Sequence, residues 1–190
     1  MQREGEVLRG DGMKALAVFV HGIDRFNDRV GRLASWLVLG IVGVCFAVVV
    51  LRYGFGYGRV WMQDLYVWLH AMVFTTVAGR TLLKDGHVRV DIFYRSSSVR
   101  RQAWVDLTGT VVFLIPYVVV LVVWSWDYVV GSWAIGEGAR NTDGLPTLYL
   151  LKSFLFVFGA VVGAQGLAMA GRSLLILLEH SPVSPAPAGE

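Results

Sequence analysis

The side chains most often used in catalysis are few in this sequence, and they do not converge. The four histidines are His21, His70, His87 and His180, and Cys45 is the only cysteine. Haem iron is held by axial ligands such as histidine, and His70 is the only histidine within an apolar stretch. A bis-histidine membrane haem would therefore lack a second ligand, and a helix-packing contact is the favoured role for His70. A single cysteine excludes an intrachain disulfide, and we expect no metal and no cofactor.

Motifs of common enzymes are also absent from the sequence. It contains no P-loop, no glycine-rich dinucleotide-binding turn, and no HExxH or GxSxG pattern. The charged residues near apolar stretches lie at the ends of those stretches, where long side chains reach water. They are Asp64, Arg80, Asp106, Asp127, Lys152 and Arg172. With no acidic residue at mid-membrane depth to relay protons, the sequence predicts part of a larger complex rather than an enzyme or a complete pump.

The composition indicates an integral membrane protein. Of the 190 residues, 55% are hydrophobic and only 16% are charged, and the mean hydropathy is +0.57. One small globular domain cannot bury that much apolar surface. The net charge is +3, but the basic residues do not form a stripe with interleaved aromatic residues, so we expect no nucleic acid partner.

Four apolar segments approach or exceed the length of about 20 residues that a membrane-spanning helix needs. The predicted spans are about 34–51, 64–83, 107–126 and 148–172. Pro116 removes one backbone hydrogen bond from the third span and is expected to bend it. The predicted fold class is therefore an all-α integral membrane protein, with a four-helix membrane domain over residues 34–178 and a disordered cytoplasmic tail over residues 179–190.

A cytoplasmic leader, residues 1–33, precedes the first span and is predicted to contain an amphipathic helix. Between positions 13 and 32, apolar residues recur at spacings of three and four, and the charged residues lie largely elsewhere around the helix. The apolar residues are Leu16, Phe19, Val20, Ile23, Phe26 and Val30, and the charged ones are Lys14, Asp24, Arg25, Asp28 and Arg29. We expect an interfacial helix, on the inner leaflet or against a partner subunit; the alternative is a solvated leader without a partner.

The distribution of lysine and arginine predicts that both termini are cytoplasmic, because basic residues are retained on that side of the membrane. Thirteen of the 17 basic side chains lie in the leader, in the connection between spans two and three, and after span four. The other side of the membrane carries only Arg52, Arg59, Arg140 and Lys152. Aromatic residues cluster at the same outer edge, where amphipathic rings favour the headgroup zone.

Small residues form a ridge along the fourth span. They are Gly159, Gly163, Gly166 and Ala170, and Gln165 lies beside them. Small residues at this spacing allow close helix approach, and a glutamine can donate a hydrogen bond across the interface. The sequence leaves two alternatives open, which are packing among the helices of this chain and packing against a partner.

Two segments combine aromatic, basic and acidic residues in distinctive patterns. The first, WMQDLYVWLHAMVFTTVAGRTLLKDGHVRVDIF, carries Trp61, Asp64, Arg80, Gly86, His87, Arg89, Val90 and Asp91. The second, GEGARNTDGLPTLYLLKSFLFVFGAVVGAQGL, carries Pro146, Lys152 and Gln165. Together they resemble the small, DctQ-like (Q-type) membrane subunit of tripartite ATP-independent periplasmic (TRAP) transporters, over residues 30–178. Gln63 stands where that family commonly has an acidic residue.

The resemblance implies a role in transport rather than a reaction. In that family, a large membrane subunit carries substrate and sodium through an elevator-type movement, a soluble periplasmic protein delivers the substrate, and the small subunit braces the large one. The implied partners are therefore the large TRAP membrane subunit, the periplasmic substrate-binding protein and the lipid bilayer. The implied location is the bacterial inner membrane, and the implied substrate is an organic acid, either a carboxylate or a 2-oxo acid.

The residues expected to serve structure or subunit contacts come from both segments and the ridge. They are Asp64, Arg80, His87, Arg89, Asp91, Lys152, Gly159, Gly163 and Gln165. For His87 and Asp91, a cap or turn within this chain and a direct subunit contact are both open. In the outer segment, Glu137, Arg140 and Asp143 are expected to be accessible for docking of the periplasmic protein.

Two other functions compete with the transporter subunit. The first is a four-helix membrane anchor for an electron-transfer complex, suggested by His70 and the abundant aromatic residues. The second is a small channel formed by several copies of the chain, which the lack of mid-membrane polar residues disfavours.

Overall fold

The described part of the molecule is entirely helical wherever it has regular structure. The computed structural model describes residues 2–86, 94 and 97–179, with side chains from residue 11 onward. Its elements are α1 (Gln2–Ser35), α2 (Leu37–Gly54), α3 (Val60–Leu83), α4 (Val99–Gly109), the π-helix η1 (Thr110–Leu114), α5 (Ile115–Ala134) and α6 (Leu148–Glu179). The prediction of an all-α protein is confirmed for these residues. The predicted tail lies, from residue 180, outside the described residues.

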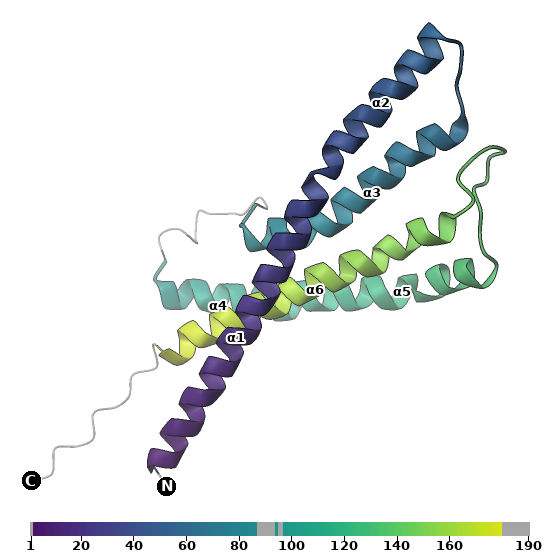
Figure 1. Ribbon diagram of the computed structural model, residues 1–190. Coiled ribbons are helices and arrows are strands. Elements are labelled where there is room, and N and C mark those ends of the chain that lie inside the picture. The colour runs from purple at the N-terminus through teal and green to yellow at the C-terminus, as the bar shows by residue number, and fades with distance from the viewer. Residues whose placement is uncertain (1, 87–93, 95–96, 180–190) are drawn as a thin grey trace, which may run out of the picture.

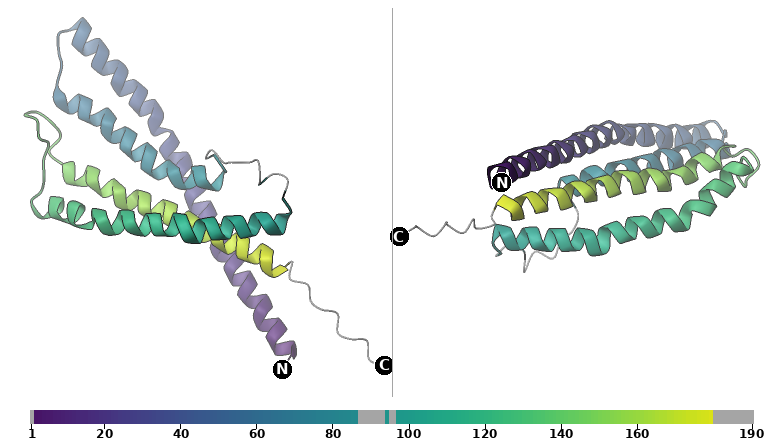
Figure 2. Two further views of the ribbon diagram at one scale, coloured as in Figure 1. Left: turned by 180° about the vertical axis from the view of Figure 1, so that it is seen from behind. Right: turned by 90° about the horizontal axis from the view of Figure 1, so that it is seen from below.

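The helices form three layers (Figures 1 and 2). The first layer is made of α1 and α2, which follow one another, the middle layer of α3 and α6, and the third of α4, η1 and α5. Helix α6 is the centre of the arrangement, since it packs against α1, α3, α4 and α5. It also contains nine buried residues, whereas α2 contains none. The outer layers therefore present most of the exposed apolar surface.

Three helices are long and apolar enough to cross a membrane: Asp11–Gly54, Val99–Ala134 and Leu148–Glu179. The first combines the predicted leader helix with the first predicted span, because one turn residue, Trp36, separates α1 from α2. The second extends the predicted third span at both ends. Helix α3 coincides with the second predicted span, but it is less apolar and is not one of the three.

The ends of the helices follow from residues that adopt or stabilise special backbone conformations. Helix α5 ends in a Schellman-type turn, in which Gly136 has a φ of 56° and the Glu137 N–H donates to the Ser132 carbonyl at 3.0 Å. Helix α3 ends in the same way, with Asp85 at a φ of 54°. Helix α4 is capped by Ser98, the residue before its first turn, whose hydroxyl accepts a hydrogen bond from the backbone N–H of Arg101.

Pro116 explains the change of helical type in the third layer. Proline has no N–H to donate to the carbonyl four residues earlier. Just before it, η1 adopts the wider π-helical turn, and the Ile115 N–H donates to the carbonyl of Thr110. The run from α4 through α5 curves accordingly (Figure 2). The sequence predicted the position of this irregularity but not its form.

The buried face of α1 combines predicted apolar residues, such as Val20, with polar residues. Asn27 is buried, and the half-buried Asp24 and Asp28 lie on the same side of the helix, toward α3 and α6. Phe19 and Phe26 are instead exposed. Asp24 and Asp28, which the sequence pattern places away from most of the apolar residues, therefore lie on the packed side of α1. Both aspartates find basic partners on the neighbouring helices, which stabilises their inward position.

Candidate functional site: polar clusters at the two ends of the helical bundle

A chain of hydrogen bonds, here called the Gln165 network, joins α1 to α6. The amide Nδ2 of Asn27 donates to Gln165 Oε1 at 2.8 Å and to the Val161 carbonyl at 3.2 Å. The amide Nε2 of Gln165 donates to Asp24 Oδ1 at 2.9 Å. Arg172 completes the chain by donating to Asp24 Oδ2 at 2.6 Å. Each of these donors meets an acceptor, whereas the buried Asn27 Oδ1 accepts no hydrogen bond among the described residues.

Burial makes this network important for stability. The side chains of Asn27 and Gln165 are among the most buried in the described part of the chain, with relative exposures of 1% and 0%. A buried polar group that loses its partner costs about 1–3 kcal/mol. Helix α3 reaches the same point through Gly79, where an added Cβ would lie 2.9 Å from Asn27 Oδ1. Glycine at this position therefore allows three helices to converge on the network.

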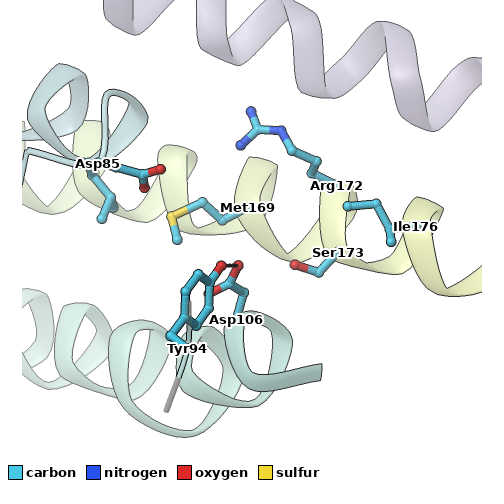
Figure 3. A pocket seen from close by; sticks show the side chains of 8 residues that line it. Asp85, Tyr94, Asp106, Met169, Arg172, Ser173 and Ile176 are labelled. Carbon is cyan, nitrogen blue, oxygen red and sulfur yellow. Dashed lines mark hydrogen bonds between the residues drawn. The ribbon is translucent and has the colours of Figure 1, made fainter. Parts of the chain in front are cut away.

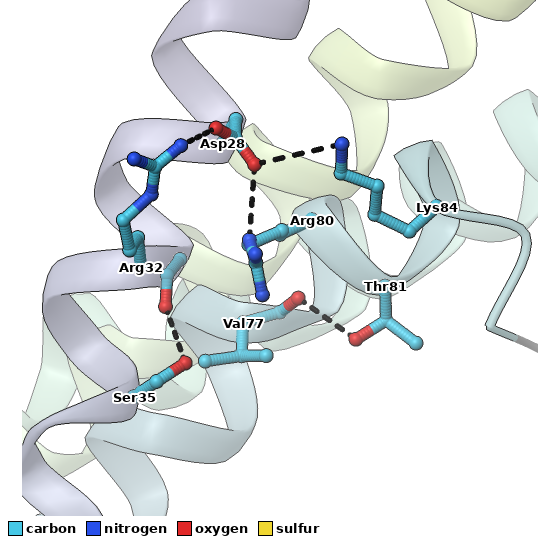
Figure 4. A network of polar contacts seen from close by, with 8 residues as sticks. Asp28, Arg32, Ser35, Val77, Arg80, Thr81 and Lys84 are labelled. Carbon is cyan, nitrogen blue, oxygen red and sulfur yellow. Dashed lines mark hydrogen bonds and ion pairs between the residues drawn. The ribbon is translucent and has the colours of Figure 1, made fainter.

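A second group, the Asp28 cluster, joins α1 to α3 and consists of Asp28, Arg32, Arg80 and Lys84 (Figure 4). Asp28 Oδ2 accepts from Arg32 on the same helix. Asp28 Oδ1 lies 3.1 Å from Arg80 Nε and 3.9 Å from Lys84 Nζ. Gly31 allows this approach, since an added Cβ there would lie 2.5 Å from Arg80 Cβ. One carboxylate therefore serves three cations.

At the opposite end, an outer cluster links the end of α5 to the start of α6. The carboxylate of Glu137 accepts hydrogen bonds from Lys152 and from the Ser132 hydroxyl, the latter at 2.6 Å. Lys152 Nζ also lies 3.9 Å from the centre of the Tyr128 ring, a cation–π geometry. The hydrogen bond from Lys152 is the main cause that lowers the pKa of Glu137 below its usual value, followed by the bond from Ser132.

The outer segment before α6 is also tied to the start of α3. Asp143, at a φ of 75°, accepts from Arg59 at 2.5 Å and from the Val60 N–H at 3.4 Å. Asp64 Oδ2 accepts from the Leu145 N–H at 2.9 Å. The strained backbone at Asp143 therefore places its carboxylate at the N-terminus of another helix, where negative charge is favourable.

A small pocket of about 160 Å³ lies beside the Gln165 network, between the end of α3, α4 and α6 (Figure 3). Its lining residues are Leu82, Asp85, Tyr94, Asp106, Met169, Arg172, Ser173 and Ile176. Within it, the Tyr94 hydroxyl donates to Asp106 Oδ2 at 2.7 Å. Arg172 connects the pocket to the network through Asp24. The lining combines acidic, basic and apolar groups, and the described contacts indicate a structural junction.

Several predicted site residues meet a partner within the chain. Arg80 pairs with Asp28, Lys152 with Glu137, and Gln165 with Asn27 and Asp24. Asp64 and Asp143 bind the outer segment to α3, as described above. Arg140 is exposed on that segment. His87, Arg89 and Asp91 lie outside the described residues.

The ridge on α6 packs against the third layer of the same chain. A Cβ added at Gly159 would lie 2.7 Å from Val122 Cγ2, and one at Gly163 would lie 3.2 Å from Val118 Cγ1. At Gly166 the nearest atom would be Leu114 Cδ2 at 2.9 Å. Small residues on α6 therefore let α5 and η1 approach closely.

Sequence reasoning missed the three polar residues of α1 that organise the inner end. One face of α1 carries four polar or small residues at spacings of three, one and three positions. They are Asp24, Asn27, Asp28 and Gly31. This polar and small stripe was the available signal. The sequence analysis followed the apolar residues of this helix and gave the stripe no contacts of its own.

His70 lies exposed on α3. Its ring stacks on Phe74 with 6.5 Å between ring centres, and Phe74 stacks on Phe158 at 6.4 Å. The histidine therefore belongs to an aromatic row that joins α3 to α6. This contact is consistent with helix packing and does not support the electron-transfer anchor.

Comparison with known proteins identifies a family for this arrangement. The family model of the DctQ component of tripartite ATP-independent periplasmic transporters matches residues 23–175. No curated protein and no solved structure matches the chain. The matched region includes the described residues of the Gln165 network, the Asp28 cluster and the outer cluster. The family is that of a transporter component rather than an enzyme.

The Gln165 network predicts a coupled loss of stability. Replacing Gln165 by Leu removes one of the two acceptors of the Asn27 amide and the amide donor to Asp24 Oδ1, so we expect the free energy of unfolding to fall by about 2 kcal/mol. The N27L/Q165L double variant should lose less than the sum of the two single variants. Thermal unfolding of the full chain in mild detergent measures both effects. The control is Q63L, which replaces a half-buried glutamine of α3 that has no hydrogen bond among the described contacts. If the stability losses of the two single variants simply added in the double variant, the coupling would be contradicted.

The outer cluster predicts a dependence of stability on pH. Because folding lowers the pKa of Glu137, its ion pair stabilises the fold above the unfolded pKa and is lost as the pH falls through the folded pKa. We expect the melting temperature to fall in this acidic range, and the fall to be smaller in E137Q. The control D127N, which removes an exposed carboxylate on α5, should keep the wild-type pH dependence. The prediction would be contradicted if the melting temperatures of the wild type and E137Q fell equally with decreasing pH.

Proposed function

Because the chain belongs to the DctQ component family of tripartite ATP-independent periplasmic transporters, we propose that it is the small membrane subunit that braces the large, sodium-coupled elevator subunit. The described contacts support a bracing role. The ion pairs and buried amides described above join helices of the same chain. Charges that are already paired internally hold the helices in place rather than carry a substrate. The internal locking of the helices is the observation that carries this proposal.

The proposed membrane arrangement has four spans, at about 34–51, 64–83, 107–126 and 148–172, in the bacterial inner membrane. Helix α3 would provide the second span. Its 24 residues extend about 36 Å at 1.5 Å per residue, which exceeds the thickness of the hydrocarbon core. It lies in the middle layer, and its least apolar positions include Asp64 and Arg80 near its ends. The excess of basic residues on one side favours both termini in the cytoplasm.

The large subunit would bind an apolar face of the outer layers. Helix α2, the π-helix η1 and helix α5 present large exposed side chains, among them Phe46, Phe113 and Trp124. In water such a surface would be unfavourable, whereas lipid and a membrane partner both accept it. The periplasmic substrate-binding protein would approach from the other direction, at the segment between α5 and α6. The proposed substrate is an organic acid, as the resemblance implies, with substrate and sodium bound by the partners.

A reconstitution experiment tests the division of labour. Liposomes containing the small and large subunits, supplied with the periplasmic protein and a sodium gradient, should take up the organic acid. Liposomes containing either membrane subunit alone should show little uptake. Co-purification of the tagged full chain identifies the large subunit to be used. Uptake by this chain alone, or a large subunit that works equally well without it, would refute the bracing role.

Docking of the periplasmic protein should depend on Arg140. Glu137 and Asp143 are engaged within the chain, whereas the exposed Arg140 can contact a partner. Charge at the edge of an interface mainly affects the association rate. We expect R140E to raise, by several-fold, the concentration of periplasmic protein needed for half-maximal uptake, with little change at saturation. R52E, at the outer end of α2, is the control; equal behaviour of the two variants would argue against docking at Arg140.

A further inference from the structure

The Asp28 cluster contains more positive charge than its carboxylate can neutralise. Arg32, Arg80 and Lys84 surround the single Asp28 side chain, which leaves a surplus of two positive charges. We propose that this cluster binds the phosphate group of an anionic phospholipid in the inner leaflet. The proposal adds a lipid-binding site to the chain and rests on the membrane orientation given under the proposed function.

Hydrogen-bond donors are available for such a phosphate. A guanidinium has five N–H donors, and a lysine ammonium has three. Among the described contacts, one nitrogen of Arg32 and one of Arg80 donate to Asp28. Lys84 Nζ lies 3.9 Å from Asp28 Oδ1. Figure 4 shows one terminal nitrogen of Arg80 on the side away from Asp28. Phosphate is well suited to this arrangement, because it accepts several charge-assisted hydrogen bonds at once.

The cluster is accessible from outside the bundle. The side chains of Arg32 and Lys84 have relative exposures of 67% and 61%, whereas that of Asp28 is 20% exposed. The carboxylate therefore lies beneath the cations and holds them in position. An anion approaching from the surface would meet the cations first.

The surroundings favour a lipid over free phosphate. Leu33 directly follows Arg32, and Trp36 lies one helical turn later, and both are strongly exposed, at 72% and 69%. These apolar side chains lie at the start of the first predicted span, where acyl chains would begin. Tryptophan is also enriched at the boundary between hydrocarbon and headgroups. A basic group beside exposed apolar side chains at this depth fits an anionic headgroup with its chains alongside.

The test measures lipid retention rather than uptake. The full chain is purified in mild detergent, mixed with phosphatidylglycerol or with zwitterionic phosphatidylcholine, and examined by native mass spectrometry. We expect selective retention of phosphatidylglycerol, and a loss of about fivefold in K84Q or R32Q. The control R29Q removes an exposed charge of the same helix outside the cluster and should change retention less than about twofold. Circular dichroism establishes that each variant is folded.

A variant that removes the negative charge of the cluster distinguishes lipid binding from a purely structural role. D28N removes the competing carboxylate, so the folded variant should retain phosphatidylglycerol at least as well as the wild type. If the cluster served only to join α1 and α3, lipid retention would not follow the number of cations. Equal losses in R29Q and K84Q would also overturn the proposal, since they would indicate general attraction to the surface.

Two further outcomes identify a different occupant and would overturn the lipid assignment. The first is inorganic phosphate that binds in a Lys84-dependent way without selective retention of the lipid. The second is a native complex in which phosphatidylglycerol is absent and Lys84 can be cross-linked to a carboxylate of another subunit. Because uptake is not measured, failure of this proposal leaves the bracing role intact, and failure of the reconstitution leaves lipid binding intact.

Discussion

The buried amide pair formed by Asn27 and Gln165 is the interaction on which the inner half of the structure depends. Inside a low-dielectric bundle, an amide without partners is costly, so the two side chains must face one another. A shift of α1 along α6 by one residue would separate them. The pairing therefore fixes the register of the two helices. Once it is fixed, Asp24 meets Arg172, and Asp28 meets Arg80 on α3.

The two ends of the bundle are held by different chemistry. The inner end combines buried amides with a carboxylate that serves several cations, and it joins helices that are far apart in the sequence. The outer end uses a carboxylate–lysine pair and a strained aspartate that closes the loop onto α3. Between them, the contacts between α6 and α5 depend on small residues and on shape. Close packing along one face of α6 therefore accompanies the polar contacts, which include Gln165 near the middle of the same helix.

The sequence predicted the helices better than it predicted their faces. It placed the start of α6 at residue 148 and the irregularity near Pro116, because helix length and proline chemistry are local properties. It could not pair Glu137 with Lys152 or Asn27 with Gln165, because those contacts depend on turns and on helix register. It also failed to combine α1 and α2 into one long, nearly continuous helix. The motif residues from His87 to Asp91 lie outside the described residues, so their roles stay predictions.

The inward position of the polar residues of α1 has a general physical cause. In water, the apolar face of a helix turns inward, because burial of apolar surface is the driving force. In a membrane the surroundings are as apolar as the core, and polar groups gain most from facing one another. Helix α1 combines both rules, because Val20 is buried beside Asn27 whereas Phe19 and Phe26 lie outside. Exposing those rings to water would cost about 25 cal/mol per Å² of apolar surface, which disfavours the solvated leader and favours contact with lipid or a partner subunit.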